Sequence, residues 1–353
     1  MAPSGSTALP LSVVIPTRNE AGTLPGLLAD LASQEGIALE VVVVDGGSRD
    51  GTRERCAAAA FPVHLVESPP GRGRQMNRGA AAARGEDLLF LHADTRLADR
   101  GLLARAREAM DRERARRGSH RVAGHFPLRF VRADPGPSAA YYFYEAKTRL
   151  NRMDCVHGDQ GMWMGRGYFQ ELGGFDEALP YLEDVRLARR VFETGTWTTL
   201  PGWAASSARR FEAEGLRRRQ TLNALLHNFE AVGLHRFFDA AREAYRSQER
   251  AGPLPLRPFL ALAHRVGREE GWGPFLRYWL RTGRYVAANG WQLAFAADCL
   301  RNRRRGVPPG EGPTAWLERY DRWAAPWVTS PAGSAAAAAL AALWFYGSWL
   351  VER

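Results

Sequence analysis

The first ninety residues alternate between short apolar runs and segments with the periodicity of helices. Each apolar run is too short for a buried helix and is followed by polar or glycine-rich residues, which is typical of strands. The expected strands are 11–16, 39–45, 63–66 and 87–91, and the expected helices are 24–31, 53–60 and 75–84. Strands that alternate with helices indicate an α/β fold with a mostly parallel sheet, Rossmann-like, covered by helices on both faces.

The pattern changes after Gly101. An amphipathic helix follows, and then residues 122–130 alternate like one antiparallel strand. Further along we expect an aromatic helix at 139–150, a polar turn entering a strand at 158–164, a short helix closed by glycine at 168–175, a helix at 181–195 that ends at Gly195, and strand and loop at 196–212. Residues 213–250 are helical by pattern, 251–258 read as a linker, and helices follow. We therefore predict three parts: a catalytic domain at 1–212, a helical segment at 213–250 that packs on it, and a helical C-terminal extension at 251–353.

Charge and tryptophan are concentrated in the last third of the chain. Of 48 basic and 38 acidic residues, residues 1–212 hold 28 and 26, so residues 213–353 hold 20 and 12 and have a net charge of +8. The same segment carries eight of the eleven tryptophans. A basic, tryptophan-rich surface favours an anionic partner, either a membrane or a nucleic acid. A solvated face over an ordinary helical core explains the pattern equally well.

Two further features bear on location. The N-terminus lacks the basic and apolar regions of a secretory signal, and the three cysteines form no CxxC pair, so we expect a reducing cytoplasm. Residues 327–351 contain no charge, but five consecutive alanines, a proline and two glycines dilute the stretch. We expect a packed or interfacial helix rather than a membrane span, and a peripheral position at the inner face of the plasma membrane is compatible with it.

Unusual polar residues follow the expected strands. Asp45 ends the second strand, and His92-Ala93-Asp94 end the fourth. Ligands of parallel sheets bind beyond the carboxyl ends of the strands. Asp94 could hold a hard cation that bridges a diphosphate, or could cap the next turn. His92 could be a second metal ligand, a partner of one, a phosphate donor or a structural histidine.

Three other segments offer binding or catalytic groups. Arg72, Arg74 and Asn77 lie near the start of the third helix, where guanidinium groups and free N–H groups suit a diphosphate. Asp45 precedes a glycine-rich turn and could accept from a base or ribose, or could simply shape the turn. Glu183 and Asp184 begin a helix, and Asp184 could be an N-cap or could take a proton from an acceptor hydroxyl.

Taken together, these motifs resemble the inverting family 2 glycosyltransferases of the GT-A fold over about residues 11–212. The resemblance rests on "VVIPTRNE", "VVVVDGGSRDGT", "LLFLHADT", "GGFDE" and "YLEDVRLARR". The segments "GRGRQMNRGAAAARGEDLLFLHADT" and "HGDQGMWMGRGYFQELGGF" further resemble the bacterial rSAM/selenodomain-associated transferase 2 subgroup, whose acceptors are poorly defined.

The resemblance implies an enzyme, a hexosyltransferase that takes its sugar from a nucleotide-diphosphate donor, UDP by default, and uses Mg²⁺ or Mn²⁺. Asp94 would bind the metal, with His92 as a candidate ligand, and Asp184, with Glu183 beside it, would be the catalytic base. The usual acidic pair is here His92-Ala93-Asp94, and losing one carboxylate weakens the metal site or shifts it toward Mn²⁺. The nucleotide-sugar site would comprise Pro16, Thr17, Arg18, Asn19, Glu20, Asp45, Gly46, Ser48, Arg72, Arg74, Asn77, His92 and Ala93, and the sugar or acceptor pocket Gly158, Asp159, Gln160 and Trp163.

Other classes of protein remain as alternatives. The altered acidic pair is compatible with a catalytically weak nucleotide-sugar-binding or regulatory protein. A Rossmann dehydrogenase is disfavoured because no GxGxxG follows the first strand. A nucleic-acid partner is not expected, since the basic tail has no recognisable module. Among transferases, a lipid acceptor at the membrane, polyprenyl phosphate or carotenoid-like, competes with a soluble small molecule.

Overall fold

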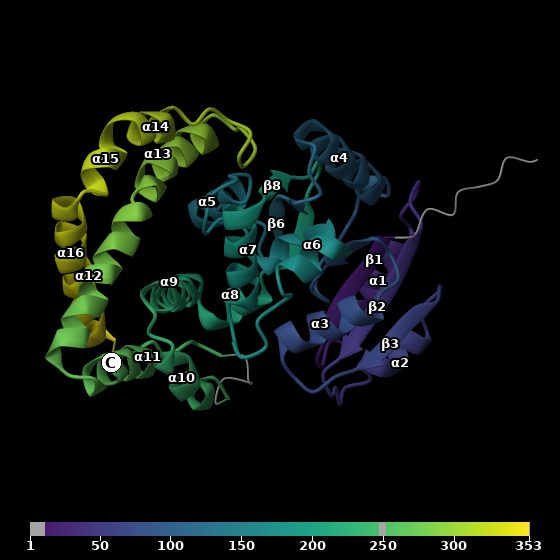
Figure 1. Cartoon of the computed structure of the whole chain (residues 1–353), viewed down its shortest axis with the longest axis horizontal. Helices are drawn as coiled ribbons and strands as arrows, with labels where there is room; N and C mark the ends of the chain where they lie inside the picture. The colour runs from purple at the N-terminus through teal and green to yellow at the C-terminus, as the bar shows by residue number, and fades with distance from the viewer. Residues whose placement is uncertain (1–10, 247–251, 353) are drawn as a thin grey trace, which may run out of the picture. The chain divides into compact units, whose positions relative to one another are not determined.

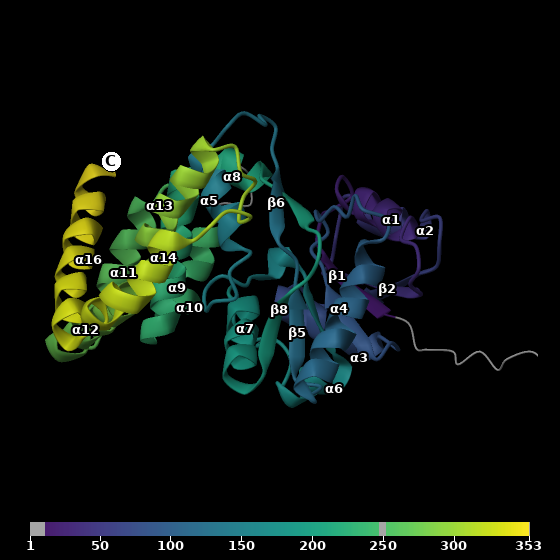
Figure 2. The same cartoon turned by 90° about the horizontal axis from the view of Figure 1, so that it is seen from above.

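The computed structural model describes residues 11–246 and 252–352 and divides them into two compact units. The first unit runs to Val131 and resumes at Tyr144–Ser207. The second consists of Arg132–Phe143 and Ala208–Arg353. Figure 1 and Figure 2 show the elements of each unit from two directions.

A seven-stranded mixed sheet forms the centre of the first unit, in the order β3-β2-β1-β4-β7-β5-β8. All its strands run in one direction except β7, which pairs antiparallel with both β4 and β5. A second, two-stranded sheet pairs β6 with β9. The strands are β1 (Leu11–Thr17), β2 (Leu39–Asp45), β3 (Val63–Glu67), β4 (Asp87–Phe90), β5 (Val122–His125), β6 (Leu128–Val131), β7 (Met162–Gly165), β8 (Thr196–Thr199) and β9 (Ala204–Ser207).

Helices cover both faces of the large sheet, because alternate residues of its strands feed two separate hydrophobic cores. Val13 and Val43 face the core under α1, α2 and α4, whereas Val14 and Val44 face the core under α3, α6 and α7. The helices of this unit are α1 (Leu24–Ala32), α2 (Thr52–Ala57), α3 (Arg72–Ala82), α4 (Leu102–Arg117), α6 (Arg166–Glu171), α7 (Glu183–Thr194) and the 3₁₀ turn η1 (Gly158–Gln160), while α5 (Ala139–Lys147) crosses the boundary between the units. The predicted fold class, a mostly parallel sheet with helices on both faces and a helical C-terminal part, is confirmed.

The second unit is helical in all its described elements after Ala208. Its helices are α8 (Arg209–Glu214), α9 (Leu216–Val232), α10 (Arg236–Arg246), α11 (Arg257–Glu269), α12 (Trp272–Ala288), α13 (Trp291–Arg304), α14 (Ala315–Arg319), the π-helical η2 (Tyr320–Ala324), α15 (Ala325–Val328) and α16 (Pro331–Val351). The helix α16 has the length and composition to cross a membrane, and only 11% of its most apolar 18-residue stretch is buried.

Two details differ from the sequence-based expectations. Residues 122–130 form β5 and β6 in two different sheets rather than one strand, because Pro127 between them has no N–H to continue the ladder. The expected linker, of which residue 251 lies outside the described residues, contains Leu254 and Leu256, and both are buried. The backbone N–H of Leu254 also donates to Glu214 O, so this segment is packed into the second unit instead of separating two parts of it.

Candidate active site

The carboxyl ends of β1, β2 and β4 meet at one edge of the sheet, and the unusual polar residues of the sequence lie there. β4 ends at Phe90, which pairs with Met162 at the start of β7. Because β7 runs the opposite way, the turn that precedes it, including η1, lies at the same edge as His92 and Asp94. The reversed strand therefore brings residues 157–161 to the end of β4.

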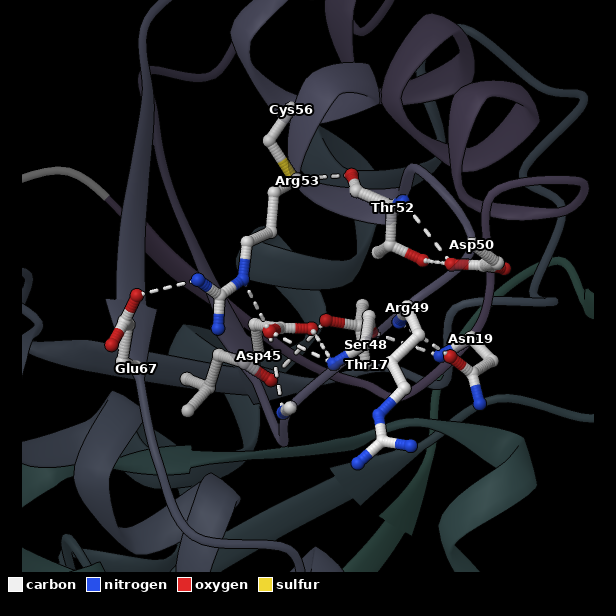
Figure 3. A network of polar contacts seen from close by, with 12 residues as sticks. Thr17, Asn19, Asp45, Ser48, Arg49, Asp50, Thr52, Arg53, Cys56 and Glu67 are labelled. Atoms are coloured by element: carbon white, nitrogen blue, oxygen red, sulfur yellow. Dashed lines mark hydrogen bonds and ion pairs between the residues drawn. The ribbon is translucent and has the colours of Figure 1, made fainter.

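The loops after β1 and β2 are joined by a network of polar contacts (Figure 3). The backbone N–H of Asn19 donates to Ser48 Oγ (2.9 Å), and its Oδ1 accepts from the Arg49 N–H (2.9 Å). Asn19 has φ 57°, a left-handed conformation that asparagine adopts more readily than most residues. Asp50 Oδ2 accepts from Ala21 N–H (3.0 Å) and completes the connection. The two loops thus form one structured surface.

Asp45 holds the second loop in shape. It is fully buried, and its Oδ2 accepts from the N–H groups of Gly47 (3.2 Å) and Ser48 (3.1 Å) and from Arg53 Nε (2.8 Å). Burial raises the pKa of Asp45, but the bonds from Ser48 and Arg53 outweigh it and hold the pKa below its usual value. The carboxylate predicted to bind the nucleoside is therefore engaged by its own loop and by Arg53.

Gln75 is a residue of this edge that the sequence did not single out. Its amide Nε2 donates to Thr17 O and to Val44 O, both at 2.8 Å, and so ties the ends of β1 and β2 together. A Cβ on Gly46 would lie 2.9 Å from this amide, so the absence of a side chain at Gly46 leaves the space that Gln75 occupies. Only the fold, which sets the start of α3 beside both strand ends, makes the role of Gln75 visible.

On the other side of β4, Asp184 and His92 converge on Gly158. The backbone N–H of Gly158 donates to Asp184 Oδ2 (2.7 Å). A Cβ at Gly158 would lie 3.1 Å from both Asp184 Oδ2 and His92 Nε2. The N-cap of α7 is Leu182, and Asp184 lies within the first turn of the helix. The capping role that the sequence allowed for Asp184 is therefore not what the structure shows.

Asp184 is an ionised carboxylate in this environment. Burial raises its pKa, but the charge of Arg72, the nearby His157 and the Gly158 N–H outweigh the burial and hold the pKa below its usual value. His157 belongs to the "HGDQG" turn, but it was not among the residues predicted for the site.

Asp159 lies close to two other carboxylates. Burial and the negative charges of Asp184 and Asp94 together raise its pKa to about 7, against the lowering effect of Arg72. Its Oδ1 is buried and accepts no hydrogen bond from the described residues. The mutual effect of these charges indicates that Asp94, Asp159 and Asp184 share one site.

Arg72 supplies the positive charge of this site. Its Nε lies 2.6 Å from Glu183 Oε1, and its Nη1 lies 3.4 Å from His92 Nε2. Burial and the charge of Arg72 lower the pKa of His92 to about 4, so the ring is neutral at pH 7. Because a guanidinium only donates, His92 Nε2 is the acceptor and its lone pair points to Arg72. This arrangement favours His92 as a partner of Arg72 over His92 as a metal ligand.

Glu183 connects two helix N-termini at the site. Its side chain is almost fully buried, and burial raises its pKa against the effect of Arg72 at the start of α3. Leu182, just before it, has φ 64°, a strained conformation for a leucine that fixes the direction in which α7 starts. Glu183 thus positions Arg72, whereas Asp184 accepts from the Gly158 N–H.

Several predicted site residues have other surroundings. Both ends of the Asn77 amide bond to the 175–177 segment, at Phe175 and Glu177, and Arg74 Nε pairs with Glu177 (3.2 Å). Trp163 is fully buried in the core beneath α1 and α4. Gln160 is also fully buried and donates to Cys155 O (2.7 Å). Arg18 is exposed, Pro16 and Glu20 are partly exposed, and Ala93 is buried.

The described residues contain no group of three or more His, Cys, Asp or Glu side chains arranged to hold a metal ion. The unpartnered Asp159 Oδ1 and the excess of carboxylates around it nevertheless fit a divalent cation, whose hard charge prefers oxygen ligands. The residues present could supply part of a coordination sphere, with the remaining oxygens coming from a diphosphate.

Gly158→Ala is expected to lower turnover about tenfold or more while changing the free energy of unfolding by no more than about 1 kcal/mol. The new methyl would press on Asp184 and His92 at 3.1 Å and displace them from their present geometry. Steady-state rates and thermal unfolding measure the two effects. Gly167→Ala is the matched control, because a Cβ there meets nothing within 4 Å. Equal rates for both variants would show that this geometry is unimportant.

Asp159→Asn is expected to stabilise the protein at pH 8, by on the order of 1–2 kcal/mol, when no metal is added. The carboxyl of Asp159 has a pKa of about 7 in the folded protein against 3.8 as the ordinary value, so the folded state binds the proton more tightly. The stability that this proton contributes is complete below about pH 4 and is lost as the pH rises through 7. Denaturant unfolding from pH 4 to pH 8 should show the gap between variant and wild type opening over that range. A constant gap would contradict the raised pKa.

Residues 12–172 match the family model described as glycosyl transferase family 2, which is a little under half of the chain. Residues 12–172 are therefore similar to the family 2 glycosyltransferases, in agreement with the resemblance expected from the sequence. The match does not distinguish subgroups of the family, so the rSAM/selenodomain-associated subgroup suggested by the sequence motifs stays a prediction.

Curated relatives match over shorter segments. A PGL/p-HBAD biosynthesis glycosyltransferase of Mycobacterium bovis is 41% identical over 101 residues, which is 27% of this chain and 39% of the relative. A glucosyl-3-phosphoglycerate synthase of Mycolicibacterium paratuberculosis is 34% identical over 92 residues, 24% of this chain and 28% of the relative. The chain thus spans well under half the length of these relatives.

Among solved structures, a mannosyltransferase from Pyrobaculum calidifontis in complex with GDP-Man and Mn²⁺ aligns with 96% of this chain and 88% of its own, at 20% identity and a TM-score of 0.48. Residues 1–349 of TarS from S. aureus, in complex with UDP, align with 84% of this chain and 92% of their own, at 19% identity and a TM-score of 0.47.

Proposed function

We propose that this protein is an inverting glycosyltransferase that moves a sugar from a nucleotide-diphosphate donor to an acceptor hydroxyl. The observation that carries the proposal is the gathering of Asp94, Asp184 and Arg72 around Asp159 at the carboxyl edge of the sheet. The family 2 match over residues 12–172 supports the same reaction. Such a site has both groups that the reaction needs: positive charge for a leaving diphosphate and a carboxylate for the incoming alcohol.

The donor nucleotide is assigned to the joined loops after β1 and β2. Pro16, Arg18 and Glu20 belong to the first loop, and Gly46 and Ser48 belong to the second. Asp45 contributes by shaping the second loop, since its oxygens already accept from that loop and from Arg53. UDP is our default nucleotide, as the sequence resemblance implies.

The leaving diphosphate is assigned to Arg72 and Asp94. Asp94 would hold Mg²⁺ or Mn²⁺, which when bound neutralises charge on the diphosphate. Arg72 stands at the N-terminus of α3, where free N–H groups add to its positive charge. Glu183 fixes the Arg72 side chain through the 2.6 Å ion pair, and the neutral His92 accepts from it. Arg72 therefore meets the substrate already oriented.

Asp184 is assigned as the base. It is ionised, and one oxygen is fixed by the Gly158 N–H, which leaves the other oxygen to accept the acceptor's proton. The alcohol would attack the anomeric carbon opposite the diphosphate as Asp184 takes its proton. One displacement inverts the anomeric centre without a covalent intermediate. Asp159, with its unpartnered Oδ1, is placed to accept from a sugar or acceptor hydroxyl.

The acceptor is proposed to be a small molecule or a lipid that carries a hydroxyl group. The competing function is that of a nucleotide-sugar-binding regulator, and product analysis separates the two. An enzyme forms a new glycoside in proportion to the nucleoside diphosphate released, whereas a regulator shows at most slow donor hydrolysis.

A thermal-shift screen of nucleotide sugars with Mg²⁺ or Mn²⁺ tests the proposal first. A donor that binds the folded state raises the melting temperature, and the rise grows with the logarithm of donor concentration over Kd. We expect one nucleotide class to stabilise the protein, and to do so more strongly with metal present. If no nucleotide sugar stabilises the protein with either metal, the proposed function fails.

A further inference from the structure

A broad apolar surface in the second unit is left uncovered by that unit. On α16, large side chains remain exposed along one side: Leu340 (66%), Leu343 (71%), Trp344 (48%), Leu350 (81%) and Val351 (81%). Together with Trp323 and Trp327 they form what we call the α16 face. We propose that the α16 face docks in the plane of an anionic lipid bilayer, as a peripheral contact that does not span it. This inference does not rest on the proposed transfer reaction.

The opposite side of α16 is fixed to α12, and the two helices lie side by side in both views (Figure 1, Figure 2). Gly283 on α12 approaches α16 so closely that a Cβ there would lie 2.6 Å from Ala338 Cβ. Farther along, Trp279 meets Phe345, with ring centroids 5.6 Å apart. Gly283 pairs with the early part of α16 and Trp279 with the late part, so the helices are antiparallel. The exposed face is therefore the side that this pairing leaves free.

The apolar surface continues onto α12. The helix α11 covers one side of the pair, since His264 Nδ1 lies 3.0 Å from Tyr346 Oη and its ring packs against Phe275. By helical periodicity, Leu276 and Leu280 lie on the side of α12 away from the one that α11 covers. Both leucines are exposed, at 61% and 47%. A surface made of two adjoining helices is wider than a single exposed stripe and exceeds what isolated surface leucines produce.

Tryptophans stand at one end of this surface. Trp323 in η2 and Trp327 in α15 are 70% and 79% exposed, and they are four residues apart, so they point the same way. Tryptophan is enriched where one part of the side chain is apolar and the other meets water, as at the boundary of a bilayer. Two adjacent exposed indoles beside a charge-free helix match that boundary better than they match open solvent.

The charge of α12 and α13 selects an anionic partner. Between residues 272 and 305 the chain has seven arginines and a single acidic residue, Asp298. Asp298 is buried, where it accepts from the N–H groups of Trp316 and Leu317. The exposed charge of this segment is thus entirely positive. Arginine beside an apolar helix face is the composition of helices that lie on anionic membranes.

The same arginines argue against a membrane span, although α16 is long enough for one. Insertion of α16 would either break its close pairing with α12 or carry α12 into the hydrocarbon. Arg277 and Arg284 of α12 are exposed, and such charges are costly to place there. Docking in the plane buries the apolar face and keeps the arginines near the headgroups.

The experiment is co-sedimentation of the full chain with vesicles, without nucleotide. Wild type is expected to bind vesicles that mix phosphatidylglycerol with phosphatidylcholine, to bind phosphatidylcholine alone more weakly, and to lose affinity as salt rises. The double variant Leu340→Asp with Leu343→Asp should bind about tenfold more weakly or worse. Both side chains are exposed, so folding should be unchanged, and circular dichroism checks this. Val131→Asp, also at an exposed apolar position but in the first unit, is the matched control and should bind like wild type.

The outcomes separate the alternatives. Loss of binding by the double variant, with the protein stripped from vesicles by alkaline carbonate, supports the proposal. Protein that resists carbonate would mean a true span, and a concentration-dependent dimer without vesicle binding would mean that a second copy covers the face. Either result overturns the proposal. Because no donor is present, failure here leaves the transferase assignment untouched, and failure of the nucleotide screen leaves this inference untouched.

Discussion

Replacing Asp184 with Asn is expected to lower turnover by about 10²–10⁴-fold while leaving donor affinity close to that of wild type. The amide is the same size as the carboxylate and can still accept from the Gly158 N–H, but it cannot take a proton from the acceptor. Steady-state kinetics give the turnover, and calorimetric titration with the donor and metal gives the affinity.

Asp111→Asn is the matched control for this variant. Asp111 is an exposed carboxylate on α4 that pairs with Arg114 at 3.4 Å. We expect the control to keep wild-type turnover. Near wild-type turnover in Asp184→Asn would show that another group serves as the base. A large fall in donor affinity would instead show that Asp184 contacts the donor.

Asp94→Ala is expected to abolish the metal-dependent part of donor binding, which the proposed mechanism assigns to this carboxylate. Removing one hard oxygen ligand from a site that has few should weaken metal-supported binding by about 10-fold to 100-fold or more. Titration of the donor in the presence and absence of Mn²⁺ measures the difference. The variant should bind the donor with the same weak affinity under both conditions.

The control for Asp94 is His92→Ala. Our geometry makes His92 a partner of Arg72, so its loss should disturb Arg72 but keep a metal-dependent difference in donor affinity. If His92→Ala removes the metal dependence and Asp94→Ala retains it, the two roles are reversed. That result would restore the alternative in which the imidazole is the ligand.

The strands of the parallel half of the sheet could be predicted closely from the sequence. The run 39–45 is β2 without any change of bounds, because a strand buried on both faces must be apolar throughout and stops where polar residues begin. The edge of the sheet at which the polar candidate residues lie could be predicted as well, since the carboxyl ends of parallel strands share one edge. The prediction of a single strand at 122–130 was wrong, because Pro127 divides this alternating segment between two sheets.

The partners of individual side chains could not be predicted. Asp45 and Asn77 have the right residue types in the right places for ligand binding, yet their polar atoms bond to nearby loops. Gln75, Arg53 and His157 were passed over because their roles depend on contacts between segments far apart in the chain. Trp163 lies on the face of β7 that packs into the core. The sequence alone could not tell which face it lies on, because that depends on how β7 pairs with β4.

The most direct test of the account is a crystal structure of the Asp184→Asn variant with an intact nucleotide sugar and Mn²⁺. We expect the metal to join Asp94 to the diphosphate and the anomeric carbon to lie between the diphosphate and residue 184. A donor bound elsewhere, or Asp94 and residue 184 lining separate cavities, would contradict the account.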